Sequence, residues 1–409
     1  MKSQQDERIM LDHEIGAVLR RDSCSGCGFC TLLDTGLAMT EDESGYLRPR
    51  RVADGDTTAD AGKTFSQACP GVRVSAKGDP ASPRHPLFGS YLFVWRAWAG
   101  HPDIRTVASS GGALTALNVW LLETKRATRV IGAASAPDPR RSVAVTLTTR
   151  AEAVSAAGSR YSPVAVLSDP GVLSAGSVVV CKPCEASALS ARQPRSEESG
   201  PLILSFFCAG TPSARATDTL LAELGVGPKT PIDELWYRGH GWPGEFTARA
   251  GSSTVRAGYD DSWGRTLGPT TQWRCKVCPD GVGESADIVA ADYWEVDEQG
   301  YPSFLEGEGV SALIARTQRG LAVIQEAEAA GVIHIEPIAM DSLAASQPLQ
   351  RDRRRFLAAR LIGSRLAGRS FPIYRGFGLL RLSLSDPRQA LIVLRGTFGR
   401  VRRSVSGSR

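Results

Sequence analysis

Four of the nine cysteines in this 409-residue sequence have the spacing of iron–sulfur cluster ligands. Cys24, Cys27 and Cys30 follow one another at two-residue intervals, and Cys69 lies further along the chain, directly before Pro70. Three close thiolates and a remote Cys-Pro pair are typical of a ferredoxin-type [4Fe–4S] cluster. The alternative is a structural zinc site, which more often combines two separate cysteine pairs. We therefore predict that this first cysteine set binds a [4Fe–4S] cluster.

The second cysteine set consists of Cys184, Cys208, Cys275 and Cys278, which are dispersed along the chain. Cys184 and Cys208 follow apolar stretches that predict strands, whereas Cys275 and Cys278 share one short knuckle. If the fold brings them together, four thiolates suffice for a second [4Fe–4S] cluster. Cys181 ends the apolar stretch before Cys184, which favours a buried structural thiol, although it could ligate in place of Cys184.

A glycine-rich segment, the serine–glycine turn, offers a site for a flavin. It comprises Ser109, Ser110, Gly111 and Gly112, and it directly precedes an amphipathic helical pattern at residues 113–124. Backbone amides and two hydroxyls at a helix N-terminus suit the diphosphate of a flavin or nucleotide. The alternative is that Ser110 only caps the helix.

A second compact turn contains Ser159, Arg160 and Tyr161. Arg160 could meet a phosphate and Tyr161 a ring face, or the segment could be a plain surface turn. Asp287 and Asp292 flank an apolar stretch and could bind ribityl or ribose hydroxyls, or merely cap the ends of a strand.

The order of the elements predicts an α/β fold. Period-2 and apolar stretches predict strands at 92–97, 129–134, 177–181, 202–207, 287–291 and 309–315, and amphipathic patterns predict helices at 113–124, 213–224 and 317–330. A hairpin at 246–257 argues against a purely parallel sheet. We expect a mixed sheet covered by helices, preceded by a small ferredoxin-like iron–sulfur module.

Three regions follow from this reading. Residues 1–80 form the predicted cluster module and include the start of a proline-rich linker at 76–86. Residues 81–345 form the predicted FAD-binding domain with the second cluster. Residues 346–409 form a basic helical region. Residues 351–409 hold fifteen arginines and two aspartates, although the net charge of the whole chain is only +5. Such a region suits an anionic surface such as a membrane face, an acidic partner or RNA, and we predict no specific nucleic acid. The alternative is a solvated, arginine-covered helical end.

Composition and missing motifs narrow the functional class. The N-terminal residues lack the apolar stretch of a secretory signal, the longest apolar run is too short to span a bilayer, and clustered cysteines favour metal binding in a reducing compartment. We therefore expect a cytoplasmic protein. No nucleophile elbow, zinc-protease motif or P-loop occurs, which excludes the corresponding hydrolases and nucleotidases.

The ordered motifs resemble one known family, the beta subunits of coenzyme F420 hydrogenases and dehydrogenases. The set runs Cys24-x2-Cys27-x2-Cys30, Cys69-Pro70, Ser109-Ser-Gly-Gly112, Gly158-Ser-Arg-Tyr161, Pro183-Cys184, Phe207-Cys208, Arg238-Gly-x-Gly-Trp-Pro-Gly244, Cys275-x2-Cys278 and Ala286-Asp-Ile288. The resemblance implies FAD near the serine–glycine turn, clusters that exchange electrons with it, and hydride transfer to a deazaflavin or another substrate. Many relatives have lysine where this chain has Arg160, and arginine does not release a proton as lysine does.

The leading hypothesis is an oxidoreductase that passes electrons between two [4Fe–4S] clusters, FAD and coenzyme F420 or another hydride acceptor, with ferredoxin or a partner subunit as donor. One alternative is an electron-transfer subunit without its own substrate site that serves a partner enzyme, including one in polysaccharide biosynthesis. A third hypothesis is a zinc-stabilised scaffold that binds an anionic polymer through its basic region.

Overall fold

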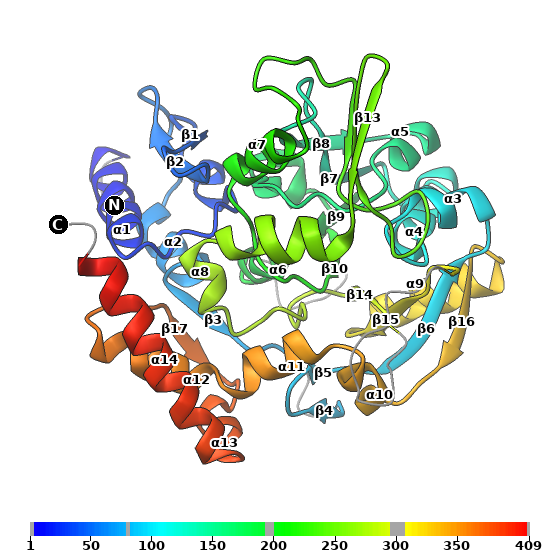
Figure 1. Cartoon of the computed structure of the whole chain (residues 1–409). Helices are drawn as coiled ribbons and strands as arrows, with labels where there is room; N and C mark the ends of the chain where they lie inside the picture. The colour runs from blue at the N-terminus through cyan, green and yellow to red at the C-terminus, as the bar shows by residue number, and fades with distance from the viewer. Residues whose placement is uncertain (1–3, 79–81, 193–199, 295–306, 407–409) are drawn as a thin grey trace.

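The computed structural model describes residues 4–78, 82–192, 200–294 and 307–406. An eight-stranded sheet forms the body of the protein, in the order β16-β6-β15-β14-β10-β9-β7-β8 (Figure 1). Its strands are β6 (Phe93–Ala99), β7 (Arg129–Ser135), β8 (Ser142–Leu147), β9 (Ser177–Cys181), β10 (Leu202–Phe206), β14 (Ile288–Asp292), β15 (Ser311–Ala315) and β16 (Ile333–Pro337). Strands β6, β14, β10, β9 and β7 run in one direction and the other three in the opposite direction. The predicted mixed sheet is confirmed.

Both faces of this sheet are apolar, because its central strands consist of successive apolar residues whose side chains point alternately to opposite sides. In β9, Val179 and Cys181 belong to one hydrophobic core, whereas Val178 belongs to the other. Helices α6 (Pro183–Ser190) and α10 (Met340–Ala345) contribute to the first core. Helices α3 (Pro102–Val107), α4 (Ala113–Glu123), α5 (Arg150–Ser155) and α9 (Gln318–Ala329) contribute to the second.

The N-terminal segment packs onto the first of these cores. Its elements are α1 (Gln4–Arg20), a 3-10 turn (Phe29–Leu32), β1 (Leu37–Glu41), β2 (Leu47–Arg51), α2 (Ala61–Ala68), β3 (Arg73–Ser75), β4 (Arg84–His85) and β5 (Gly89–Ser90). Helix α1 was not predicted, although its buried residues Leu11, Ile15 and Val18 recur at helical spacing. Part of the predicted linker, residues 79–81, lies outside the described residues.

A third core lies beside the main sheet. The predicted hairpin is confirmed as β12 (Phe246–Ala250) and β13 (Ser253–Ala257), and it pairs with β11 (Glu234–Trp236). Helix α7 (Ala214–Glu223) packs against this small sheet. The neighbouring segments are a π-helix (Asp260–Leu267), α8 (Trp273–Lys276) and 3-10 turns at Val166–Ser168, Pro170–Leu173 and Gly268–Thr270.

The C-terminal region is helical, as predicted, and consists of α11 (Pro348–Arg355), α12 (Leu357–Leu366), β17 (Ile373–Arg375), α13 (Leu379–Leu384) and α14 (Pro387–Ser406). Strand β17 pairs in parallel with β3, so the C-terminal region packs beside the N-terminal segment, and α1 and α14 lie on the same side of the molecule (Figure 1). Among the described residues, no helix combines the length and apolar character needed to cross a bilayer.

Candidate functional site

The first cysteine set converges on one cavity next to α1. Cys24 and Cys27 come from the loop that follows this helix, Cys30 comes from the 3-10 turn after it, and Cys69 caps the C-terminal end of α2. All four line a cavity whose other walls are mainly apolar, including Ile15, Val18, Phe29 and Phe65. Backbone amides of Gly26 and Gly71 donate to the sulfur atoms of Cys24 and Cys69, both at 3.4 Å.

Glycine is required at Gly28 in this cysteine loop for a conformational and a steric reason. The residue has φ +86°, and a Cβ atom placed on it would lie 2.4 Å from the hydroxyl oxygen of Ser168. The loop therefore packs directly against the segment that precedes β9, and a larger residue would push it away.

The thiols of this set are buried close to one another. Burial, followed by the nearby Cys24, raises the pKa of Cys27 to about 11. Burial also raises the pKa of Cys30 well above its usual value, and Cys27, Cys24 and Cys69 add to the shift in that order. Iron would replace these thiol protons and neutralise the mutual repulsion of the thiolates. Four sulfur donors in an apolar pocket therefore fit an iron–sulfur cluster.

The second cysteine set gathers at one edge of the main sheet. Because β9 and β10 are parallel neighbours, Cys184 and Cys208, which follow them, lie at the same edge. Cys275 lies in α8 and Cys278 just after it, and the amide of Thr211 donates to the Cys275 sulfur at 3.4 Å. Burial, followed by Cys275, raises the pKa of Cys208 to about 12, and Cys278 contributes to the shift.

Cys184 lies at the start of α6, and burial raises its pKa, with Glu185, then Cys27 of the first set, then Cys208 adding to the shift. Within the described parts of the chain, no three His, Cys, Asp or Glu side chains lie close enough to hold a single metal ion. Thiolates of a cluster bind different iron atoms, so they are spaced more widely than the ligands of one ion.

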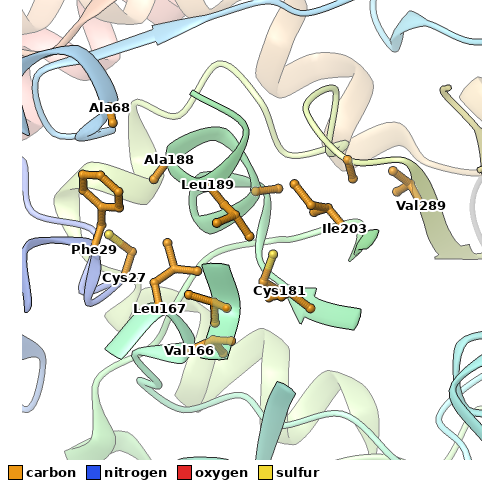
Figure 2. Packing of buried hydrophobic residues seen from close by; sticks show 14 of the residues in the cluster. Cys27, Phe29, Ala68, Val166, Leu167, Cys181, Ala188, Leu189, Ile203 and Val289 are labelled. Carbon is orange, nitrogen blue, oxygen red and sulfur yellow. The ribbon is translucent and has the colours of Figure 1, made fainter. Parts of the chain in front are cut away.

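Cys181 lies in the same hydrophobic core as Cys27, Cys30 and Cys69, and Glu185 and then Cys27 add to the effect of burial in raising its pKa. Cys181 is the last residue of β9 and is 1% exposed. Figure 2 shows its side chain among core residues that include Leu189 and Ile203, whereas Cys27 lies beside Phe29 and Leu167. Period-2 alternation turns Cys181 toward the same core as Val179.

Buried cations lie between the two cysteine sets. Arg274, which is 2% exposed, donates from Nε to the carbonyl oxygen of Pro70 at 3.0 Å. Burial alone would lower the pKa of Arg274, but Tyr374, followed by three cysteines of the second set, outweighs it and raises the pKa. Lys182 donates to Glu185 at 2.7 Å and to the carbonyl oxygen of Val164 at 2.6 Å. Burial alone would lower the pKa of Lys182, but Glu185 and then Cys184 outweigh it and raise the pKa. Sequence spacing gave no signal of this arrangement.

The serine–glycine turn lies at the same sheet edge, after β6. The hydroxyl of Ser110 donates to the carbonyl oxygen of Val310 at 2.9 Å, so it does not cap α4. Gly112 holds the N-cap position with φ +75°, and because glycine has no side chain, the N-terminus of the helix has no side-chain cap. A Cβ on Gly111 would lie 2.4 Å from the carbonyl oxygen of Ala97, so glycine is required there. A helix N-terminus without a side-chain cap fits an anionic cofactor group.

The second turn meets the first. The hydroxyl of Ser159 donates to that of Ser109 at 2.8 Å. Tyr161 lies 4.8 Å from the ring of Trp263 and 5.7 Å from that of Tyr237, measured between centroids. Burial raises the pKa of Tyr161.

Arg160 points into the protein. Its guanidinium donates to the hydroxyl of Ser142 and to the carbonyl oxygens of Pro139, Arg141 and Leu235, at 2.8 to 2.9 Å. These contacts hold loops together, and a contact with a cofactor phosphate stays a prediction.

The structure separates the two aspartates that flank β14. Asp287 accepts hydrogen bonds from the amide of Ile203, the hydroxyl of Thr317 and the guanidinium of Arg319, so it ties strand ends together. In the β14–β15 register Asp292 is opposite Ser311, whose hydroxyl donates to that of Ser110 at 3.3 Å. Asp292, and not Asp287, therefore lies at the end of the sheet that carries the serine–glycine turn.

A buried arginine that the sequence did not assign holds this region together. Arg238, 2% exposed, donates to Asp292 at 2.6 Å, to the carbonyl oxygen of Ser109 at 2.7 Å and to that of Pro243 at 2.9 Å. The rings of Trp242, Tyr259 and Trp294 lie 5.2 to 5.4 Å from its guanidinium carbon. Arg238 begins a glycine-rich motif, but the composition of that motif indicated no partner for the arginine.

The sequence and the fold of the chain are similar to those of known proteins. Residues 94–169 match the model of the coenzyme F420 hydrogenase/dehydrogenase beta subunit N-terminus, and residues 176–341 match that of its C-terminus. No curated protein matches the sequence. A chain of the F420-reducing [NiFe] hydrogenase complex from Methanosarcina barkeri is 20% identical with a TM-score of 0.51, over 66% of this chain and 91% of that chain. This likeness shows a shared fold.

Proposed function

Because the chain belongs to the coenzyme F420 hydrogenase/dehydrogenase beta-subunit family, we propose that it is an iron–sulfur flavoprotein oxidoreductase with two [4Fe–4S] clusters and FAD. The family supports an oxidoreductase role in electron transfer. The two clusters, FAD, and coenzyme F420 or another compound as hydride acceptor are the finer parts of the proposal.

The observation that carries this proposal is that the two cysteine sets and the serine–glycine turn lie close to one another. The two cysteine sets are near neighbours: Gln272, three residues before Cys275, donates to the carbonyl oxygen of Ser25 at 3.0 Å, and Arg274 donates to that of Pro70 at 3.0 Å. The serine–glycine turn follows β6, and Cys208 follows β10, three strand positions away in the same sheet. At the usual strand spacing this separation is about 14 Å between strand axes. Ligands of parallel sheets bind at this carboxyl edge.

Each part of the chain has a distinct task in this proposal. The first cysteine set, which lies outside residues 94–341, and the second set, which lies within them, would each hold one cluster. The serine–glycine turn would hold the FAD diphosphate at the N-terminus of α4, with Ser159 and Tyr161 beside it. When bound, the clusters and the flavin would supply one-electron and hydride chemistry respectively. Lys182 and Arg274 would offset the negative charge of the second set.

Metal and flavin content test the proposal directly. We expect protein purified anaerobically to be brown and to contain about eight irons, about eight sulfides and one flavin per chain. Cys24→Ser and Cys275→Ser should each remove about half of the iron. Cys181→Ala is the comparison variant: full iron content assigns Cys184 as the ligand of the second set, and loss of about half of the iron assigns Cys181 instead. Colourless protein with stoichiometric zinc and no flavin would overturn the proposal.

Turnover decides between the proposal and the alternative of a pure electron-transfer subunit. If the chain has its own substrate site, reduced deazaflavin should reduce the isolated protein and bleach its absorbance under anaerobic conditions. Reduction that appears only after a ferredoxin or a partner subunit is added would favour the alternative.

The arginines of the C-terminal region divide into two groups. Four are used inside the protein: Arg353 and Arg360 donate to backbone carbonyls, Arg354 pairs with Glu284, and Arg369 pairs with Asp22. Others, such as Arg388 and Arg395 of α14, are exposed next to Leu391 and Ile392, which are 46% and 58% exposed. This outward face is the part of the region that we propose for an anionic surface. We also propose a cytoplasmic location, because cysteines clustered for metal binding favour a reducing compartment.

A further inference from the structure

A large cavity separates the second cysteine set from the C-terminal helices. Its volume is about 660 Å³, within the usual range of small-molecule sites. Cys275 and Ala209 line one wall, and residues of α11, α12 and α14 line the opposite wall. Eight of its sixteen lining residues come from beyond position 346 and so lie outside the residues that match the family. The cavity therefore depends on a part of the chain to which the family assigns no role.

This cavity carries an excess of positive charge. Lys276, Arg353 and Arg360 line it, and among the described residues none of them forms an ion pair with a carboxylate. Asp352, the acidic residue in the wall, pairs with Arg351 at 3.0 Å. Backbone carbonyls orient the cations: Arg353 donates to Cys208 at 2.9 Å, and Arg360 donates to Lys276 at 2.8 Å. Carbonyl dipoles position these charges without neutralising them.

The cations also repel one another. Burial, followed by Arg353 and Arg400, lowers the pKa of Arg360 to about 10. Arg400 donates only a long hydrogen bond, 3.4 Å, to the hydroxyl of Thr397 among the contacts of the described residues. An anion between these groups would relieve the repulsion, since opposite charges at short range attract strongly in a partly buried site.

The remaining walls are apolar and aromatic. Trp263 and Phe356 face the cavity together with Leu349 and Val393. The Trp263 ring is also the neighbour of Tyr161, so this wall adjoins the residues around the serine–glycine turn. Rings and aliphatic side chains beside a group of cations suit a ligand that is apolar at one end and anionic at the other.

We propose that this cavity is a second binding site, separate from the serine–glycine turn, for an organic anion with an apolar or aromatic body. The carboxylate, sulfonate or phosphate group contacts Lys276, Arg353 and Arg360, and the body packs on Trp263 and Phe356. The site requires neither cluster, so it can fail while the proposed function holds, and the reverse.

The fluorescent anion 8-anilinonaphthalene-1-sulfonate tests this site on the full chain, because it combines a sulfonate with aromatic rings. We expect saturable binding of one dye per chain. Arg360→Gln removes a cation and should weaken binding about tenfold. Val393→Trp fills the cavity and should abolish binding without changing charge. Arg395→Gln, an exposed arginine on α14 outside the cavity, is the matched control and should bind as the natural chain does.

Two results would overturn the proposal. One is equal dye binding by the natural chain and by Val393→Trp, with folding checked by circular dichroism. The other is loss of binding in Leu384→Gln while Arg360→Gln binds normally, because this would place the dye on the exposed face of α13, where Leu384 is 71% exposed. If Arg360→Gln does not fold, the Val393→Trp result decides.

Discussion

Replacing Arg238 by methionine should destabilise the protein strongly. The change removes a guanidinium that is 2% exposed and leaves Asp292, 22% exposed, without its partner at 2.6 Å. It also removes the donors to the carbonyl oxygens of Ser109 and Pro243. Breaking a buried ion pair from one side typically costs about 3–5 kcal/mol. The free energy of unfolding should therefore fall by about that amount in Arg238→Met.

The chain offers a matched control for this prediction. Arg249 and Glu234 form an ion pair of almost the same length, 2.7 Å, but their side chains are 53% and 55% exposed. Water already solvates both charges, so Arg249→Met should cost only about 0–1 kcal/mol. Urea unfolding followed by tryptophan fluorescence and by circular dichroism would compare the two variants with the natural chain.

A double-mutant cycle shows whether the Asp292 pair is the cause. Asp292→Asn removes the charge that Arg238→Met would strand, so the double variant should be at least about 1 kcal/mol more stable than the sum of the two single effects implies. The reasoning is refuted if Arg238→Met costs no more than Arg249→Met, or if the two single effects add. Flavin content is a separate readout, because Arg238 holds the carbonyl of Ser109 in the serine–glycine turn.

Three further predictions concern other parts of the molecule. Lys182→Met should cost about 3–5 kcal/mol in urea unfolding because it strands the fully buried Glu185, and adding Glu185→Gln should recover part of this loss. Burial alone would raise the pKa of Asp34, but hydrogen bonds from Arg51 and Thr57 outweigh it and lower the pKa below 3.8. The contribution of this carboxylate to the free energy of unfolding is therefore present above pH 3.8 and is lost as the pH falls through the lowered pKa. Asp34→Asn should lack this part of the acid dependence of stability. Vesicles that contain anionic lipid should bind the chain more weakly at high salt, and more weakly still with Arg388→Glu; binding equal to that of neutral vesicles would contradict the proposed surface.

Local patterns were sufficient for the central elements of the fold. The apolar stretches that became β9, β10 and β14, and the amphipathic patterns that became α4, α7 and α9, were predicted within two residues at each end. Edge strands were not: β8 is mostly half-buried or exposed, and β16 alternates with His334 and Glu336 and ends at Pro337. Strands covered on one side or at an edge carry a weaker apolar signal, so the sequence did not separate them from loops.

The sequence by itself determined the first cysteine set, because a C-x2-C-x2-C segment places three sulfur atoms together through local backbone geometry alone. Only the tertiary structure decided the rest. Parallel pairing of β9 and β10 brings Cys184 to Cys208, and the antiparallel register of β14 and β15 places Asp292 beside the serine–glycine turn and Asp287 at the opposite end. Such contacts join residues that are far apart in the chain. Strand pairing and register determine which of these residues meet, and no local spacing in the sequence encodes them.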